Sequence, residues 1–239
     1  MIKKIWQYRW VFRSLIKTLY FNFHYLPFRQ AIKLPILLYK PKLLKCKGTI
    51  EIKGHVKFGM IKLGPYSVSI YPNTGIVFEN HGGKITFNGN CSIGNNSFIS
   101  IGKTGNVIFG KNFCSTSSLK LASYSNIVFK DDVLCGWNCM FIDTDFHKLT
   151  LVDNTNSPKA YDNIIIGNNC WFALNNTIMK GTILGDNNVI AGNSLLNKDY
   201  HDYSYCLFAG QPAVVKKKGT QVQDRSAIGC QVQTLIIYT

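Results

Sequence analysis

His147 is the residue of this 239-residue chain whose surroundings best fit catalytic chemistry. It lies in a polar segment, residues 143–163, that interrupts an otherwise regular pattern, and Asp143 and Asp145 come shortly before it. An imidazole with its ordinary pKa of about 6.5 accepts a proton near neutral pH. A nearby carboxylate can orient the ring, and Asp145 is the better placed of the two. The segment therefore predicts a loop that carries a general base, His147, and its orienting acid, Asp145.

The pattern that this loop interrupts has a period of six residues. A period of six fits neither an α-helix nor a single strand, but it fits short strands joined by tight bends and stacked rung upon rung. Asparagines between the apolar positions suit the bends, because asparagine tolerates positive φ. We therefore expect an all-β solenoid whose large apolar side chains point into a narrow prism. The periodic apolar residues are Ile166, Phe172, Ile178, Leu184, Ile190 and Leu196.

The stretch IGNNCWFALNNTIMKGTILGDNNVIAGNSLLNKD, followed by FAGQPAVVKKK, resembles the C-terminal signature of the hexapeptide-repeat acyltransferases. The similarity runs from about Ile85 to Lys218 and is densest from Asp143 onward. Within that family, the chain looks most like the maltose and galactoside O-acetyltransferases and their relatives that modify capsules and lipopolysaccharides. The resemblance implies a left-handed parallel β-helix that forms a closed homotrimer, with each active site between two chains.

The resemblance also implies a reaction and the residues for it. Acetyl-CoA would be the acyl donor, a sugar or glycan hydroxyl the acceptor, and His147 the base that takes the hydroxyl proton. Asp143, Thr116 and Ser118 are the positions expected to contact the acceptor. The family's motif places coenzyme contacts at small, aromatic and basic positions late in the chain: Trp171, Ala173, Leu174, Gly192, Asn197, Lys198, Lys216 and Lys217.

Other functions fit parts of the same sequence. An amine acceptor would make the protein an amino-sugar N-acetyltransferase, because an amine is a better nucleophile and needs a base less. A non-catalytic solenoid could serve as a binding scaffold, since a fold does not fix a function. We expect no metal, although Cys135, Cys139 and His147 could be imagined as zinc ligands. The repeat already accounts for both cysteines as compact apolar residues.

Charge separates the N-terminal part from the rest of the chain. The formal net charge is +15, and no acidic residue precedes Glu51. Residues 1–26 predict an amphipathic helix that ends at Pro27, within a basic helical segment over residues 1–48. This segment could cap the solenoid, or it could lie on an anionic membrane. The solenoid should occupy residues 49–218, and the tail over residues 219–239 has little pattern.

The sequence also gives an expectation for the cellular location of the protein. It has no apolar run of about 18 residues and no recognisable cleavage site after its basic start. We therefore expect a cytoplasmic protein, either free or attached peripherally to the inner face of the plasma membrane. A nucleic-acid partner is not expected, because no nucleic-acid-reading module accompanies the basic arm.

Overall fold

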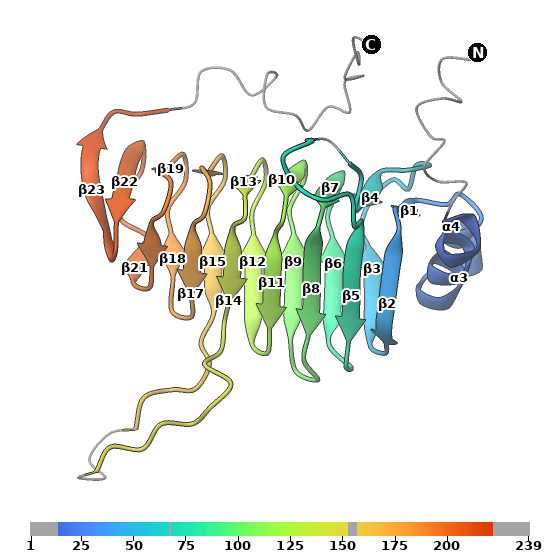
Figure 1. Ribbon diagram of the computed structural model, residues 1–239, viewed down its shortest axis with the longest axis horizontal. Coiled ribbons are helices and arrows are strands. Elements are labelled where there is room, and N and C mark those ends of the chain that lie inside the picture. Colours follow the sequence, from blue (N-terminus) through green and yellow to red (C-terminus); the bar gives the residue numbers. More distant parts are fainter. Residues whose placement is uncertain (1–13, 67, 153–156, 222–239) are drawn as a thin grey trace.

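The computed structural model describes residues 14–66, 68–152 and 157–221. Its strands form three sheets that enclose a prism, and successive strands along the chain pass from sheet A to sheet B to sheet C (Figure 1). Each strand pairs in parallel with the strand of the same sheet one turn later, except where the last two strands form an antiparallel hairpin. The predicted fold, a left-handed parallel β-helix preceded by helix, is confirmed.

The three sheets consist of short strands. Sheet A is formed by β1 (Ile36–Leu38), β4 (Ile61–Leu63), β7 (Cys91–Asn95), β10 (Phe113–Ser117), β13 (Leu134–Trp137), β16 (Trp171–Phe172), β19 (Val189–Ile190), β22 (Cys206–Gly210) and β23 (Ala213–Lys218). Sheet B is formed by β2 (Pro41–Cys46), β5 (Ile76–Asn80), β8 (Ser97–Ile101), β11 (Lys120–Ser123), β14 (Met140–Ile142), β17 (Thr177–Met179) and β20 (Leu195–Leu196). Sheet C is formed by β3 (Thr49–Ile52), β6 (Lys84–Phe87), β9 (Asn106–Phe109), β12 (Asn126–Phe129), β15 (Ile164–Ile166), β18 (Ile183–Leu184) and β21 (Asp199–Tyr200).

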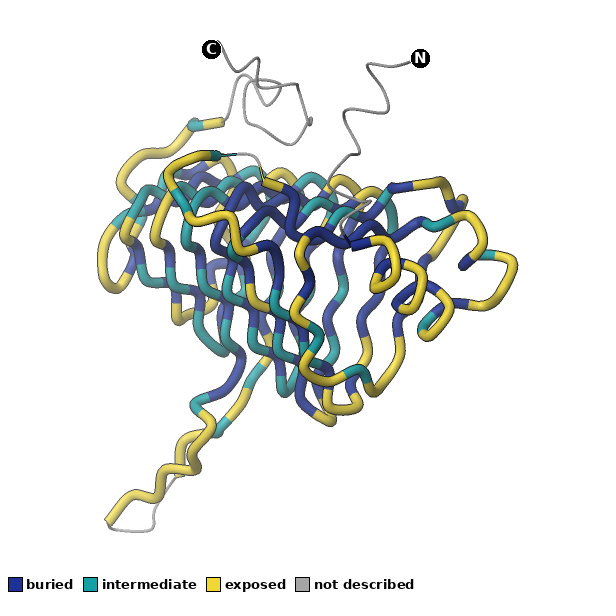
Figure 2. Tube along the Cα trace, turned by 45° about the vertical axis from the view of Figure 1, so that its right-hand side comes forward, coloured by how far each residue is buried: buried dark blue, intermediate teal, exposed yellow. Residues whose placement is uncertain are grey.

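The six-residue period places one large apolar side chain on each wall of the prism. Phe172 of sheet A pairs with Ile190 in the next turn, and the equivalent pairs in the other sheets follow the same register. These side chains are buried in the interior. In Figure 2 the buried residues appear as dark blue stretches along the walls of the prism. The predicted inward direction of the periodic residues is therefore confirmed.

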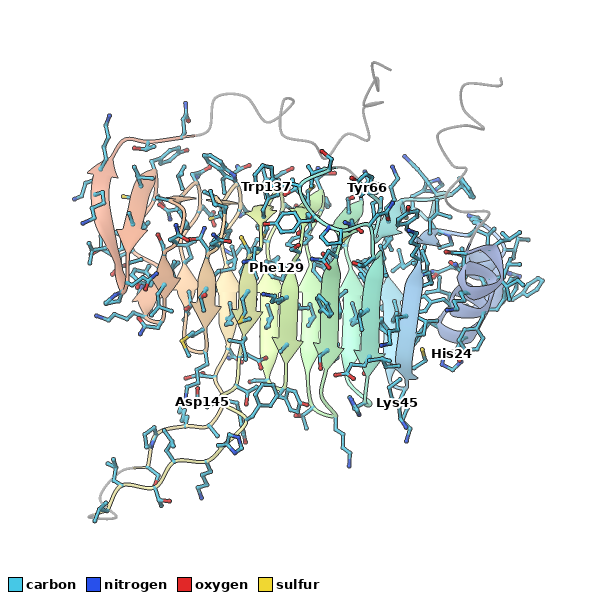
Figure 3. All side chains as sticks on the ribbon, viewed as in Figure 1. His24, Lys45, Tyr66, Phe129, Trp137 and Asp145 are labelled. Carbon is cyan, nitrogen blue, oxygen red and sulfur yellow. The ribbon has the colours of Figure 1, made fainter. Side chains whose placement is uncertain are left out.

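Aromatic stacking continues this packing through the middle of the prism. The rings of Phe87, Phe109 and Phe129 occupy equivalent positions in sheet C and stack on one another. Their centroids lie 5.2 Å and 5.5 Å apart, close to the spacing expected between paired strands. Phe129 marks this column in Figure 3. The parallel register therefore brings identical side chains into contact on successive rungs.

The corners of the prism use asparagine as the sequence predicts. Asn169, Asn175 and Asn187 all have positive φ, between 56° and 61°. A second polar residue beside the bend also hydrogen-bonds to the corner backbone. The side-chain amide of Asn188, for example, donates to the carbonyl oxygens of Gly185 and Tyr203. The corner backbone is thus satisfied by side chains as well as by the neighbouring rung.

Two helices, α3 (Leu15–Tyr25) and α4 (Phe28–Ala31), cover the N-terminal end of the prism (Figure 1). The solenoid begins at Ile36, so the predicted boundary at residue 49 is too late. Of the predicted helix over residues 1–26, positions 1–13 lie outside the described residues, as do positions 222–239 of the tail. Among the described residues, no helix is long and apolar enough to cross a membrane.

Candidate active site

The segment that interrupts the repeat leaves the prism between β14 and β15, over the predicted residues 143–163. Figure 1 shows it as a long loop directed away from the walls, and Figure 2 shows its outer part exposed. Its two ends pair as an antiparallel ribbon. Thr144 bridges Tyr161, and the amide of Asp145 donates to the carbonyl of Ala160 at 2.8 Å. The base of the loop is therefore ordered by backbone hydrogen bonds.

Asp143 ties this ribbon to the rung before it. Its carboxylate accepts hydrogen bonds from the hydroxyl of Ser123 and from the backbone amides of Tyr124 and Ser125, at 2.6–2.9 Å. Burial raises the pKa of the carboxyl, and these three donors oppose that rise. Asp143 is fully buried and stabilises the corner, and its predicted contact with the acceptor stays a prediction.

Asp145 faces a lysine and not the histidine. Its Oδ2 atom lies 2.5 Å from Nζ of Lys180, which also donates to the backbone carbonyl of Lys159. One ammonium group therefore links both strands of the loop base to the rung beneath them. Figure 3 shows Asp145 at the point where the loop leaves the prism. Lys180 follows the buried hexad position Ile178 by only two residues but lies 35 positions after Asp145, so no local pattern predicts this pairing.

His147 lies just beyond this ribbon, with its side chain exposed. The preceding residue, Phe146, has a φ of 60° and packs its ring edge-on against Tyr124 at 5.1 Å. Its amide donates to the hydroxyl of Thr144 at 2.9 Å. Within the described parts of the chain, no hydrogen bond or ion pair involves the His147 ring. Backbone geometry and the Phe146 contact therefore set the direction in which the imidazole is presented.

Four predicted coenzyme residues cluster at the corner between sheets A and B. Trp171 is partly exposed on β16, and Ala173 and Leu174 follow it into the bend. Gly192 occupies the same bend one rung later, where a Cβ atom would lie 3.3 Å from Leu174. The missing side chain gives a ligand access to the backbone at this corner. Leu174 is exposed there and could contact an extended apolar chain.

The other predicted coenzyme residues lie elsewhere on the protomer. Asn197 and Lys198 are exposed at the corner between sheets B and C, where the carbonyl of Lys198 accepts from the amide of Ile183. This is the corner that carries the 143–163 loop. Lys216 and Lys217 are exposed on β23 at the C-terminal end. Within one protomer, Leu174 and His147 therefore lie at different corners of the prism.

Two other residues predicted to contact the acceptor, Thr116 on β10 and Ser118 just after it, are buried. Ser118 accepts a hydrogen bond from the amide of Asn96, and the Thr116 hydroxyl is directed to the carbonyl of Cys135 at 3.5 Å. Both side chains are buried in this protomer, and their contact with the acceptor stays a prediction. The overlying segment, whose described residues are 64–66 and 68–75, hydrogen-bonds to Asn95 of sheet A through Pro65, Pro72 and Gly75.

Aromatic side chains lie at the same corner. Tyr71 of the overlying segment meets Trp137 edge-on, with 6.3 Å between the ring centroids. Figure 3 shows Trp137 and Tyr66 along the upper edge of the prism. Tyr66 is largely exposed, and Trp137 and Tyr71 are partly so. The sequence alone does not predict this contact, because Tyr71 and Trp137 lie on different turns of the solenoid, far apart in the chain.

The cysteines of the zinc alternative are core residues. Cys135 and Cys139 are buried, and burial raises the pKa of both thiols, to about 11 for Cys139. A raised pKa disfavours the thiolate that zinc requires. Among the described residues, no three histidine, cysteine or acidic side chains come together as a metal site.

Comparison with known proteins assigns the family. No family model matches the chain. The chain is 31% identical over 201 residues to an uncharacterized 24.8 kDa protein in the cps region of Klebsiella pneumoniae, covering 84% of this chain and 87% of that protein. It is 44% identical over 54 residues to a probable macrolide acetyltransferase of Lysinibacillus sphaericus, covering 23% of this chain and 29% of the relative. The chain therefore belongs to the same family as this cps-region protein.

Solved structures of acetyltransferases resemble the chain more distantly. The polySia-specific acetyltransferase NeuO is 17% identical, with a TM-score of 0.49 over 79% of this chain and 91% of NeuO. The polysialic acid O-acetyltransferase OatWY is 17% identical, with a TM-score of 0.39 over 79% and 92% of the two chains. The Vibrio cholerae acetyltransferase VCA0836, in complex with acetyl coenzyme A, is 16% identical, with a TM-score of 0.37 over 85% and 84%. The family assignment does not rest on these values.

Proposed function

We propose that the protein transfers an acetyl group from acetyl-CoA to a hydroxyl of a bacterial surface polysaccharide or of its lipid-linked precursor. The observation that carries this proposal is the exposed His147, presented on a loop whose base is fixed by Asp143 and by the Asp145–Lys180 ion pair. A rigid base under an exposed imidazole suits general-base catalysis on a large acceptor. The relative from a cps region supports a polysaccharide acceptor.

In the proposed reaction, the acceptor oxygen attacks the thioester carbonyl while His147 takes the hydroxyl proton. The new carbon–oxygen bond forms an ester, and the carbon–sulfur bond breaks. The proton taken by His147 then passes to the sulfur that leaves, which regenerates the neutral imidazole. Atoms and charges therefore balance without a metal or a redox partner. Because the ring is exposed, both the acceptor and the thioester can approach it in the assembled enzyme.

The coenzyme residues are assigned by the same proposal. Leu174 and Gly192 offer an exposed apolar side chain and accessible backbone to the pantetheine arm. Lys198, Lys216 and Lys217 are exposed cations suited to phosphate groups. The corner between sheets A and B and the lysines on β23 lie on the C-terminal half of the solenoid. A cytoplasmic site follows from the use of acetyl-CoA.

A homotrimer would complete such a site. In one protomer, His147 extends from one corner of the prism, whereas Leu174 and Gly192 lie at another. Closed threefold symmetry would bring the 143–163 loop of one copy toward the Leu174 corner of the next. The proposal therefore includes a partner copy that contributes residues to each site.

The test is to incubate the purified protein with acetyl-CoA and oligosaccharides from the host's own surface polymer. A mass gain of one acetyl group that disappears in mild alkali supports O-acetylation, because esters are hydrolysed under conditions that amides survive. An alkali-stable acetyl group would instead identify an N-acetyltransferase. Failure to bind coenzyme A in a calorimetric titration would contradict both and favour a non-catalytic scaffold.

A further inference from the structure

Helix α3 presents its polar stripe to the protein. Ser14, Thr18 and Asn22 are buried at this edge of sheet A. Thr18 and Asn22 hydrogen-bond to the backbone of β1, and Ser14 bonds to the amide of Lys40 just after it. Phe21 is the main apolar contact on this side, with its ring edge-on to Phe78 at 5.1 Å. The amphipathic pattern of residues 1–26 does not indicate which way the apolar face points. The structure turns most of that apolar face outward.

The outward side of the two helices is consequently apolar. Ile16 is 83% exposed and Phe28 is 70% exposed, and the others around them expose between a third and three-fifths of their surface. Water-soluble proteins seldom expose a contiguous group of this kind without a partner. We call this group the end face; its members are Ile16, Leu19, Tyr20, Phe23, Phe28 and Ile32.

Cations surround the end face. No acidic residue occurs before Glu51 in the sequence. Within the described ranges, every salt bridge joins residues at or beyond position 51, so the cations between residues 14 and 47 are not neutralised by carboxylates. Figure 3 shows Lys45 and His24 at this end of the molecule. The exposed cations are Lys17, Arg29, Lys33, Lys40, Lys42, Lys45 and Lys47.

We propose that the end face is a docking surface for an anionic phospholipid bilayer. Aromatic and aliphatic side chains on one side of a helix, bordered by lysine and arginine, are typical of helices that lie in the membrane interface. The cations would be attracted to acidic headgroups, and the apolar side chains would enter the acyl boundary. A second copy of the chain is a poorer partner for this surface, because its own uncompensated cations would face those of the first.

The fold fixes the orientation that docking would produce. Because α3 and α4 cover the end of the prism, the solenoid would stand on the membrane surface with its long axis along the membrane normal (Figure 1). Sheet B places β14 four pairings after β2, in the order β2-β5-β8-β11-β14. At about 4.8 Å per pairing, the 143–163 loop starts roughly 20 Å from the capped end. If the proposed function holds, this height suits a glycan attached to a membrane lipid.

Vesicle co-sedimentation of the full-length protein tests the proposal. The probes are vesicles of phosphatidylcholine alone and vesicles that also contain phosphatidylglycerol. The wild-type protein should sediment with the anionic vesicles and be released by salt. Ile16→Glu combined with Phe28→Glu should lower the affinity by at least about tenfold, because two exposed apolar groups that would enter the membrane become charged. Val214→Glu, an exposed position at the opposite end of the solenoid, is the matched control and should bind normally.

A second set of variants tests the charge without touching the apolar residues. Lys33→Gln, Lys42→Gln and Lys45→Gln together should weaken binding and flatten its salt dependence. Replacing Lys216, Lys217 and Lys218 by glutamine removes the same net charge at the far end and should have little effect. Circular dichroism should show all variants folded, since each altered side chain is exposed.

Several results would overturn the docking surface. These are wild-type protein that ignores anionic vesicles, an end-face variant that binds as tightly as wild type, and equal binding to neutral vesicles. Deleting residues 1–13 is a further arm: loss of all binding in this deletion, with the end-face variant unaffected, would assign the membrane contact to that segment. Acetyl transfer to a soluble oligosaccharide does not require docking, so failure of this proposal is separable from failure of the proposed function.

Discussion

The side-chain amide of Asn22 forms with Ile36 the two backbone hydrogen bonds that a neighbouring strand would otherwise form. Its Nδ2 atom donates to the Ile36 carbonyl at 2.7 Å, and its Oδ1 atom accepts from the Ile36 amide at 3.1 Å. Thr18 and Ser14 accept from the amides of Leu38 and Lys40 in the same way. Four helical residues rise about 6.0 Å and two strand residues about 6.6 Å, so the polar stripe matches the edge of the sheet. The helix thus covers an edge that would otherwise be open to pairing.

Removing the Asn22 amide should destabilise the capped end. In Asn22→Leu, the amide and carbonyl of Ile36 lose their partner while remaining covered by α3. Each unsatisfied buried group costs about 1–3 kcal/mol, so the loss of two should lower the free energy of unfolding by roughly 2–6 kcal/mol in urea titrations. Asn90→Leu, at an exposed corner, should change it by less than about 0.5 kcal/mol. Equal effects of the two substitutions would contradict the proposed edge cap.

The ion pair between Asp145 and Lys180 should position the 143–163 loop for catalysis. Lys180→Gln should lower kcat by about tenfold to a hundredfold, because a displacement of about 1 Å in the base can have that effect. The KM for acetyl-CoA should change much less, and Lys180→Arg should recover part of the activity. Steady-state kinetics on the glycan acceptor provide the measurement.

A double-mutant cycle separates this role from a general loss of charge. Because Asp145 and Lys180 contact one another, Asp145→Asn and Lys180→Gln should have combined effects smaller than their sum. Lys130→Gln breaks an exposed ion pair with Asp186 at a different corner and should leave kcat unchanged. Full activity in Lys180→Gln would remove the positioning role.

His147→Ala should abolish most of the turnover while leaving the coenzyme bound. A general base contributes roughly 10²–10⁴-fold, so kcat should fall within that range. Calorimetry should show unchanged affinity for coenzyme A. His81→Ala replaces another partly exposed histidine, from an earlier rung, and should retain activity. Normal turnover of the His147 variant would leave the proposed reaction without its base.

Much of the fold could be predicted because the repeat is local. Each large apolar residue, such as Phe172, meets its equivalent one turn later, so the period alone indicates the wall on which it lies. The boundaries of the 143–163 loop were predictable for the same reason, since the period stops and resumes there. The start of the solenoid was placed too late because Ile36–Leu38 lies between prolines and lacks a six-residue pattern.

The direction of a helix face and the partner of a carboxylate depend on residues distant in the sequence. In the sequence, Asn22 is a polar residue within an apolar helix. Its burial is explained only by its hydrogen bonds to Ile36 on the edge strand β1. Asp143 and Asp145 look equivalent in the sequence. The first bonds to the corner at residues 123–125, and the second bonds to Lys180. No local pattern distinguishes these outcomes.

The corners offer a direct test of why asparagine recurs in the repeat. Asn187 has a φ of 61°, a conformation that costs a β-branched residue about 1–2 kcal/mol or more. Asn187→Val should therefore lower the free energy of unfolding by about that amount. Asn187→Gly removes the same side chain but permits positive φ, so it should be close to wild type in urea unfolding. A glycine variant as unstable as the valine variant would show that the side chain, and not the backbone, matters.

His201 gives the solenoid a titratable group at its C-terminal end. Its Nδ1 atom donates a hydrogen bond to the Asp199 carboxylate at 2.8 Å, and its Nε2 atom lies 3.0 Å from the Asp202 carboxylate. The Asp199 carboxylate, with a smaller contribution from Asp202, raises the pKa of His201 above its ordinary value. The folded state therefore holds the extra proton more tightly than the unfolded state. The resulting stabilisation is fully present below the unfolded pKa of about 6.5 and is lost as the pH rises through the folded value.

Asp199→Asn should return the His201 titration toward its ordinary range, because the main source of the shift becomes neutral. Nuclear magnetic resonance titration of the His201 ring measures this directly in the folded protein. Glu51→Gln removes one negative charge at the opposite end of the solenoid and should leave the His201 titration where it is. If both variants moved the titration equally, net charge and not the local carboxylate would be responsible, and the assigned pairing would be wrong.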